Sequence, residues 1–320
     1  MNTSLQAPVP LSLRYPGFPW GPLCLMSGMY EPLFNSNGPL SIMIDRQQRR
    51  SAGKKSRATM AGRADRHKLY ELSVQSADAD IDFIDDTFRA LKKRKACTWR
   101  EDFCGTANNS CAWVRRRSGN HALAVDHDSS VLEWGRKHHV AKLTKEQAGR
   151  IRQVNQDVMR IVSKNMDVVI ALNFSYWVFR ERRTMLRYFR RVHSALAPDG
   201  ILFLDAFGGY EALREMREST RHKNFTYIWD QANYDPITGD YLCKIHYKLS
   251  DGSMLREAFI YHWRLWTLPE LTEMLTEAGF RATVYWEGTA PGGGGNGVFK
   301  PATRGEADAC WIAYLVAEKI

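Results

Sequence analysis

The chain has 320 residues, of which 44% are hydrophobic and 25% are charged. These proportions are close to the globular average, so they exclude wholesale disorder and a fibrous repeat, and the length allows one large domain or two ordinary ones. The formal net charge is +10 at pH 7, but residues 1–68 hold ten Lys or Arg against three Asp or Glu, so most of the positive charge belongs to the N-terminal part.

Residues 1–62 carry seven of the twelve prolines and a basic run from Arg49 to Arg57, with no helical or strand period. We expect a disordered extension here, followed by one domain over residues 63–320. The extension could be a basic arm for nucleic acid, an anchor on an anionic surface, a solvated tail, or an upstream extension of a chain that starts at Met43 or Met60.

The six cysteines form no C-x-x-C pair and no zinc-finger spacing, which predicts reduced thiols in a cytoplasmic protein and no metal site. The apolar stretch from Leu11 to Tyr30 is interrupted by Pro16, Pro19 and Pro22. It therefore fits neither a signal-peptide core nor a membrane helix, and we expect no membrane partner.

From about residue 70 the hydrophobic pattern becomes regular, beginning with an amphipathic helix over residues 79–91. Five strands are then predicted, at residues 96–100, 121–125, 151–154, 166–172 and 200–206. Helices are predicted between them, at residues 106–117, 131–143 and 180–196. Strands that alternate with helices indicate a doubly wound α/β fold, with a mostly parallel sheet and helices on both faces.

The alternation changes after Gly209. Three segments of period two, at residues 225–231, 241–249 and 255–263, surround turn signals and predict a small antiparallel insertion over about residues 219–263. A helix over residues 269–278 and strands at residues 281–286 and 309–317 then complete a seven-stranded main sheet. The glycine-rich stretch 291–297 has no phosphate-binding frame, so we expect a flexible connection.

In a doubly wound sheet the ligand lies outside the carboxyl ends of the strands. The predicted loop after the first strand runs from Arg100 to Ala107 and has one glycine, Gly105, together with the acids Glu101 and Asp102. A dinucleotide site would need a glycine-rich turn that receives an anion, so these acids argue against NAD. Negative charge instead suits a ligand with an ammonium and a sulfonium group, which describes S-adenosylmethionine.

The same loop resembles the first motif of the class I S-adenosylmethionine-dependent methyltransferases, in which an acid precedes a G-x-G-x-G-like turn. Phe103 stands where the first glycine is usual and Ala107 where the third is. Asp126 ends the second predicted strand, Asp157 follows the third, and the stretch from Asp167 to Asn173 resembles the fourth-strand motif of that family. Any one of these acids alone would suit a strand end or a helix cap, but together they follow the order of the family.

The resemblance implies a small-molecule methyltransferase that binds S-adenosylmethionine, with Asp126 at the ribose hydroxyls and Asp157 and Val158 at the adenine. The implied cofactor-binding residues are Glu101, Cys104, Gly105, Thr106, Ala107, Asp126, His127, Asp157, Val158 and Asn173.

The segment from Asn173 to Tyr176 has the outer residues of the N-P-P-Y motif of amino-group methyltransferases, although both prolines are absent. The resemblance implies that Asn173 and Tyr176 are catalytic and that the acceptor can be an amine. An apolar strand end is the alternative interpretation of this segment.

The antiparallel insertion is rich in aromatic residues, and aromatic walls can hold a flat or cationic acceptor. We expect Trp229, Trp263, Arg264 and Trp266 to bind substrate, although large aromatic residues also dominate the cores of small sheets.

The predicted helix over residues 180–196 has an arginine-rich outer face, which keeps two other functions open. With the basic N-terminal part it would allow an RNA methyltransferase that contacts phosphates. The other alternative is a noncatalytic protein that binds S-adenosylmethionine. The oligomeric state and the acceptor atom are not readable from this sequence.

Overall fold

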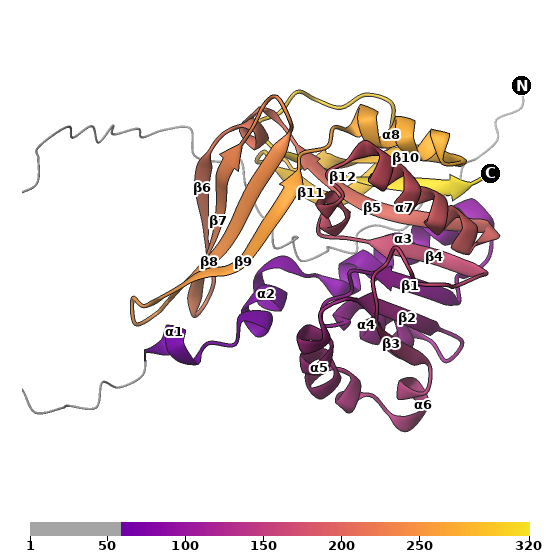
Figure 1. Cartoon of the computed structure of the whole chain (residues 1–320), viewed down its shortest axis with the longest axis horizontal. Coiled ribbons are helices and arrows are strands. Elements are labelled where there is room, and N and C mark those ends of the chain that lie inside the picture. Colours follow the sequence, from indigo (N-terminus) through magenta and orange to yellow (C-terminus); the bar gives the residue numbers. More distant parts are fainter. Residues whose placement is uncertain (1–58) are drawn as a thin grey trace, which may run out of the picture.

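A computed structural model describes residues 59–320 (Figure 1). The predictions for residues 1–58 lie outside the described residues. The expected domain boundary at residue 63 falls inside a short helix, α1 (Met60–Arg63). The backbone N–H groups of Met60 and Ala61 donate to Asp251 and Ser253 at the tip of an antiparallel hairpin, so the folded part begins before residue 63.

The main sheet has eight strands in the spatial order β11-β10-β12-β5-β4-β1-β2-β3. The bounds in that order are β11 (Gly295–Ala302), β10 (Phe280–Thr289), β12 (Trp311–Lys319), β5 (Leu196–Gly208), β4 (Met166–Ala171), β1 (Thr98–Asp102), β2 (His121–Asp126) and β3 (Ile151–Asn155). Strands β3, β2, β1, β4 and β5 are parallel, and β12 is antiparallel to both β5 and β10. The doubly wound fold predicted from the sequence is confirmed.

Helices cover both faces of this sheet (Figure 1). The remaining helices are α2 (Arg66–Val74), α3 (Ala77–Lys92), α4 (Asn108–Arg116), α5 (Ser129–His138), α6 (Lys145–Ala148), α7 (Arg182–Ala195) and α8 (Leu268–Glu277). The apolar side chains of α3 and α4 form one core with Val168 and Ile170, whereas those of α7 and α8 pack with Val169 and Ala171. Alternate residues of β4 thus point into opposite layers, as a doubly covered strand requires.

The insertion after β5 is a separate antiparallel sheet of four strands, which lies beside the main sheet (Figure 1). Its strands are β6 (Met216–Arg221), β7 (Phe225–Tyr234), β8 (Asp240–Leu249) and β9 (Met254–Arg264). The sequence pattern identified β7, β8 and β9 but missed β6, whose side chains alternate only between partly buried and exposed.

Two expectations for the main sheet are wrong. The stretch 291–297 is not a simple loop, because it turns at residues 290–294 and continues as β11, an edge strand paired with β10. The sheet therefore has eight strands instead of seven. Strand β1 also ends two residues later than expected, so Glu101 and Asp102 belong to the strand and not to the loop.

Among the described residues, none of the helices combines the length and apolar character that crossing a bilayer requires.

Candidate functional site

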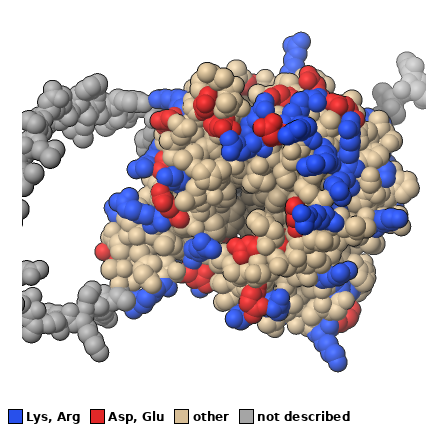
Figure 2. Space-filling model, in the orientation of Figure 1, with Lys and Arg blue, Asp and Glu red and all other residues tan. Residues whose placement is uncertain are grey.

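The loops that follow β1, β2, β3 and β4 lie at one edge of the main sheet, because these strands run parallel. These loops carry the predicted residues Gly105, Asp157 and Asn173, and Asp126 is the last residue of β2, so the fold brings all four to the same edge. Figure 2 shows a hollow in this face of the molecule, between the antiparallel sheet and the main sheet, with acidic side chains on its rim.

The backbone after β1 adopts the left-handed conformation at each position where the motif usually has a glycine. The φ angles are 57° at Phe103, 53° at Gly105 and 58° at Ala107. This conformation costs a residue with a side chain about 1–2 kcal/mol, so two residues here are strained. The ring of Phe103 lies near those of Phe179 and Tyr188, at 5.8 and 6.1 Å between centroids, and this packing offsets part of the strain.

Asp126 is the carboxylate that faces this loop. Its Oδ2 accepts a hydrogen bond of 2.8 Å from the backbone N–H of Gly105, and its Oδ1 accepts one of 2.9 Å from Asp128. The Nδ1 atom of His127, an exposed side chain, lies 3.8 Å from Oδ1. A carboxylate oxygen can accept more than one hydrogen bond, so Asp126 retains acceptor capacity for a ligand.

Glu101 and Asp102 do not extend into the loop. Glu101 accepts hydrogen bonds from the backbone and the hydroxyl of Ser110 in α4, at 3.0 and 2.5 Å. Asp102 points to the opposite layer, where it pairs with Arg100 at 2.7 Å and accepts from Tyr188. Burial raises the pKa of Glu101 to about 8, against the lowering effect of its hydrogen bonds from Ser110. The sequence argument that placed two charges in the loop is therefore wrong, and Asp126 is the acid that meets the loop.

Helices α5 and α2 hold the loop at Thr106. A Cβ atom at Gly135 of α5 would lie 2.1 Å from the Thr106 carbonyl oxygen, so only glycine allows this approach. The Thr106 hydroxyl donates to Oε1 of Glu71 in α2 at 2.5 Å, and Nε2 of His139 lies 2.6 Å from the same oxygen. Thr106, a predicted cofactor residue, is thus fixed on two sides.

The turn after β4 is anchored by Asp205 at the end region of β5. Asn173 and Phe174 both have φ of 56°, and their backbone N–H groups donate to the two carboxyl oxygens of Asp205 at 2.7 and 2.9 Å. Tyr176 is fully buried, and its hydroxyl donates to the backbone oxygen of Asp205. Burial also raises the pKa of Asp205 to about 7. Asn173 is partly exposed at this edge, whereas Tyr176 is buried and supports the turn through its hydrogen bond to Asp205.

The other predicted cofactor residues divide by burial. Asp157 is exposed and accepts from the backbone N–H of Met159 at 2.8 Å, and Val158 beside it is buried. Cys104 is buried, and its backbone N–H donates to the carbonyl of Val125 at 3.0 Å. Asp157 is therefore accessible to a ligand, whereas Cys104 supports the loop from within.

Neither protein-family models nor curated protein sequences match the chain. Solved structures do. An S-adenosylmethionine-dependent methyltransferase from Clostridium acetobutylicum matches with a TM-score of 0.59 and 15% identity, over 79% of this chain and 98% of the other. CalS10, an amino pentose methyltransferase from Micromonospora echinaspora, matches with a TM-score of 0.58 and 15% identity over 79% and 96%. KedS8, a sugar N-methyltransferase from Streptoalloteichus, matches with a TM-score of 0.54 and 14% identity, over 88% of this chain and 99% of the other. The chain has the fold of the class I S-adenosylmethionine-dependent methyltransferases.

In this methyltransferase fold, an aromatic cluster joins the antiparallel sheet to the turn after β4. Trp263 lies 6.2 Å from the ring of Phe174 and 4.4 Å from that of Tyr261. Trp229 lies 6.2 Å from Trp263. Both tryptophans are buried, so most of their surface is core, as the alternative interpretation had it. The indole N–H of Trp263 is buried without a hydrogen-bond partner among the described residues.

Arg264 and Trp266 lie between this cluster and α8. The Arg264 guanidinium stacks on the Trp266 ring at 3.9 Å and pairs with Glu270 at 2.9 Å. Trp266 is 2% exposed. The ion pair between Arg264 and Glu270 joins β9 to the first turn of α8. The contact of Arg264 and Trp266 with substrate stays a prediction.

Two residues at this edge of the methyltransferase fold were missed from the sequence, Glu71 and Asp205. Glu71 lies in α2, a helix that the sequence pattern did not predict because its apolar residues Leu69, Leu72 and Val74 do not share one helical face. Asp205 lies within an apolar strand, and an acid in such a run is a signal that can be read from sequence. Glu71 accepts a hydrogen bond from the Thr106 hydroxyl, and Asp205 accepts one from the Asn173 backbone. Both partners lie more than 30 residues away in the sequence.

Proposed function

We propose that the chain is an S-adenosylmethionine-dependent methyltransferase whose acceptor is an amine on a small molecule. The observation that carries this proposal is the arrangement of the left-handed loop after β1, Asp126 and the Asn173 turn at one sheet edge of this fold. The neighbours described as an amino pentose methyltransferase and a sugar N-methyltransferase support the amine and the small acceptor.

The described residues fit the cofactor. A Cβ atom built at Gly105 would meet nothing within 4 Å, so the backbone there faces open space that a ligand can enter. In the proposed complex Asp126 accepts hydrogen bonds from the ribose hydroxyls, and Asp157 and Val158 lie beside the adenine. Glu101, which is turned to Ser110, acts on the ligand only through the loop it supports.

S-adenosylmethionine supplies a methyl group bonded to a sulfonium. When the methyl group is transferred, the sulfur departs as a neutral thioether. The protein then mainly has to position the acceptor in line with that group. We assign this task to the Asn173 side chain and the carbonyls of its turn, which accept hydrogen bonds from the amine and direct its lone pair. Trp263, whose ring lies 6.2 Å from that of Phe174 in this turn, supports the turn from the antiparallel sheet.

The cofactor assignment is tested by Asp126→Ala and Asp126→Asn. Loss of two charge-assisted hydrogen bonds, each worth roughly 1.5–3 kcal/mol, should weaken S-adenosylmethionine binding by about tenfold to a few hundredfold, with water recovering part of the loss. Calorimetry with S-adenosylmethionine, S-adenosylhomocysteine and NAD measures this. Asp86→Ala, an exposed acid on α3, is the matched control and should bind as the wild type does.

Tight NAD binding, or unchanged S-adenosylmethionine affinity in both Asp126 variants, would contradict the cofactor assignment. Binding of S-adenosylmethionine without methyl transfer to any member of a panel of amines, alcohols and acids would favour the noncatalytic alternative.

One observation bears on the RNA alternative. Basic side chains gather over α7 (Figure 2), where Arg183, Arg187 and Arg191 follow a four-residue spacing along one face. Arg182 and Arg190 of the same helix pair with Glu277 of α8, which accounts for part of this charge. Retention of RNA that decreases steeply with salt and depends on α7 arginines would favour the RNA alternative over the small acceptor.

A further inference from the structure

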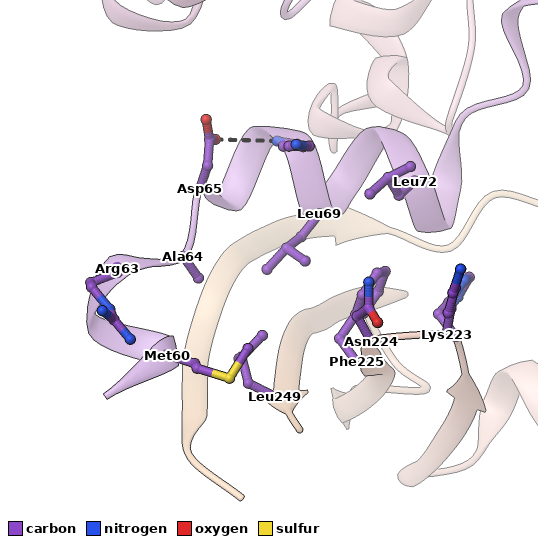
Figure 3. Close-up of a pocket in the computed structure, with 12 residues that line it drawn as sticks. Met60, Arg63, Ala64, Asp65, Leu69, Leu72, Lys223, Asn224, Phe225 and Leu249 are labelled. Atoms are coloured by element: carbon purple, nitrogen blue, oxygen red, sulfur yellow. Dashed lines mark hydrogen bonds between the residues drawn. The ribbon is translucent and has the colours of Figure 1, made fainter. Parts of the chain in front are cut away.

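A cavity of about 580 Å³ lies between the N-terminal helices and the antiparallel sheet (Figure 3). Helices α1 and α2 form one wall, and the β6–β7 turn with the end of β8 forms the other. The volume falls within the range of about 300–1,000 Å³ that is typical of small-molecule sites. No residue proposed above for the cofactor or the acceptor lines this cavity.

The floor of the cavity is apolar. Met60, Leu69, Phe225 and Leu249 point towards one another across it (Figure 3). Leu72, a further lining residue, is 58% exposed, so an apolar side chain is left in contact with water. Covering such a surface with hydrocarbon is favourable by about 25 cal/mol per Å².

The rim of the cavity is cationic. Arg63, Lys68 and Lys223 line it, and Figure 3 shows Arg63 and Lys223 at opposite ends. Within the described part of the chain, none of these three cations forms an ion pair. Asp65 is the one acid among the described residues that line the cavity, and its oxygens accept from the backbone of α2 and from the indole N–H of Trp134, so the lining carries three positive charges against one negative charge.

His222 adds a neutral polar group to this rim. Its ring stacks on Phe225 at 4.6 Å, and its Nε2 atom is buried without a hydrogen-bond partner among residues 59–320. Burial lowers the pKa of His222, so the ring is neutral at physiological pH and can donate one hydrogen bond. This nitrogen adds an unpartnered hydrogen-bond donor to the same end of the cavity as its sequence neighbour Lys223, a combination that suits an oxygen of an anion.

We propose that this cavity is a second binding site, which takes an amphiphile with a hydrocarbon chain and an anionic head group. The chain lies on Leu69, Phe225 and Leu249, and the head group lies at the cationic rim. This site is separate from the proposed cofactor site, because α2 stands between them: Leu69 faces the cavity while Glu71 bonds to Thr106. An occupant that holds α2 against the antiparallel sheet would also steady the Glu71 contact.

The probe is dodecanoate, measured by calorimetry on the full chain below its micelle concentration. We expect one molecule to bind per chain, and the cation dodecyltrimethylammonium to bind at least tenfold more weakly. The triple variant Arg63→Gln, Lys68→Gln, Lys223→Gln should weaken dodecanoate at least tenfold. All three side chains are exposed, so this variant should keep the thermal midpoint of the wild type.

A matched control removes the same charge elsewhere through Lys142→Gln, Lys164→Gln and Arg183→Gln, which are exposed and outside the cavity. It should bind dodecanoate within twofold of the wild type. Equal weakening in both triple variants, equal binding of the cationic probe, or displacement of dodecanoate by S-adenosylmethionine would each overturn the proposal. Failure of S-adenosylmethionine to bind at all would remove the proposed function but leave this site intact.

Discussion

Individual side chains decide how the turn after β1 keeps the geometry of a glycine-rich motif with a single glycine. Phe103 and Ala107 both adopt the left-handed conformation, and both are packed against neighbours. Phe103 meets other aromatic rings, and Ala107 is fully buried with Cys104 and Leu132. The strain at these positions is held in place by packing, as is common at functional sites.

Ala107→Gly tests this strain. Relief of about 1–2 kcal/mol is offset by the lost methyl group and by the greater backbone freedom of glycine, so the free energy of unfolding should change by less than about 1 kcal/mol. Ala112→Gly, inside α4 with ordinary helical geometry, should lose about 1–2 kcal/mol. Urea unfolding compares the two, and equal losses would show that Ala107 is not strained.

Glu101→Gln tests the buried acids. Burial raises the pKa of Glu101 to about 8 and those of Asp80 and Asp205 to about 7, so these three acids bind more protons in the folded chain than in the unfolded chain between about pH 4 and pH 8. Their contribution to the free energy of unfolding should therefore decrease as pH rises through this window.

A glutamine at position 101 accepts the Ser110 hydrogen bonds without ionising, so the variant should be more stable than the wild type at pH 8, by at least about 1 kcal/mol, and similar to it at pH 5. Urea unfolding at several pH values measures the difference. A pH profile parallel to that of the wild type would show that Glu101 does not titrate in this range.

Two contacts position the elements around the candidate site. Helix α5 approaches the backbone of the loop after β1 at Gly135. The Asp205 carboxyl of β5 accepts hydrogen bonds from the backbone of the turn after β4. These contacts set the loop positions relative to the sheet more directly than the loops' own sequences do.

Gly135→Ala should push α5 away from Thr106, since the new Cβ atom would lie 2.1 Å from a backbone oxygen. Overpacking of this kind costs about 1–3 kcal/mol, and cofactor affinity should also decrease because the loop moves. Gly119→Ala, where nothing lies within 4 Å of the added atom, is the control. Thermal unfolding and calorimetry follow both effects, and a Gly135→Ala chain as stable as the control would place α5 farther from the loop.

The two halves of the domain are joined by α2, which lies between the antiparallel sheet and the β1–β3 side of the main sheet (Figure 1). It contacts the main sheet side through Glu71 and Thr106, and the antiparallel sheet through Ser73 and Tyr247 at 3.3 Å. Tyr70 adds a ring contact of 4.9 Å with Phe259. Helix α2 is therefore a structural bridge and part of the cover over the candidate site.

Truncation tests the bridge. A chain that begins at Thr59 should keep the thermal midpoint of the full chain within about 2 °C, whereas one that begins at Ser76 should lose at least about 4 °C, since each kcal/mol corresponds to about 2–4 °C at this size. The shorter chain should also bind S-adenosylmethionine more weakly. Equal midpoints for both truncated chains would show that α2 joins nothing essential.

Local pattern in the sequence determined the strand and helix alternation, the position of the antiparallel insertion, and the chain order of Gly105, Asp126, Asp157 and Asn173. These features follow from periodicity and turn signals between neighbouring residues. Only the tertiary structure decided that Glu101 faces Ser110, that α2 is a bridge, that Asp205 holds the Asn173 turn and that a glycine-rich stretch pairs as β11. The reason is physical: each depends on a partner distant in sequence, and local pattern does not identify such a partner.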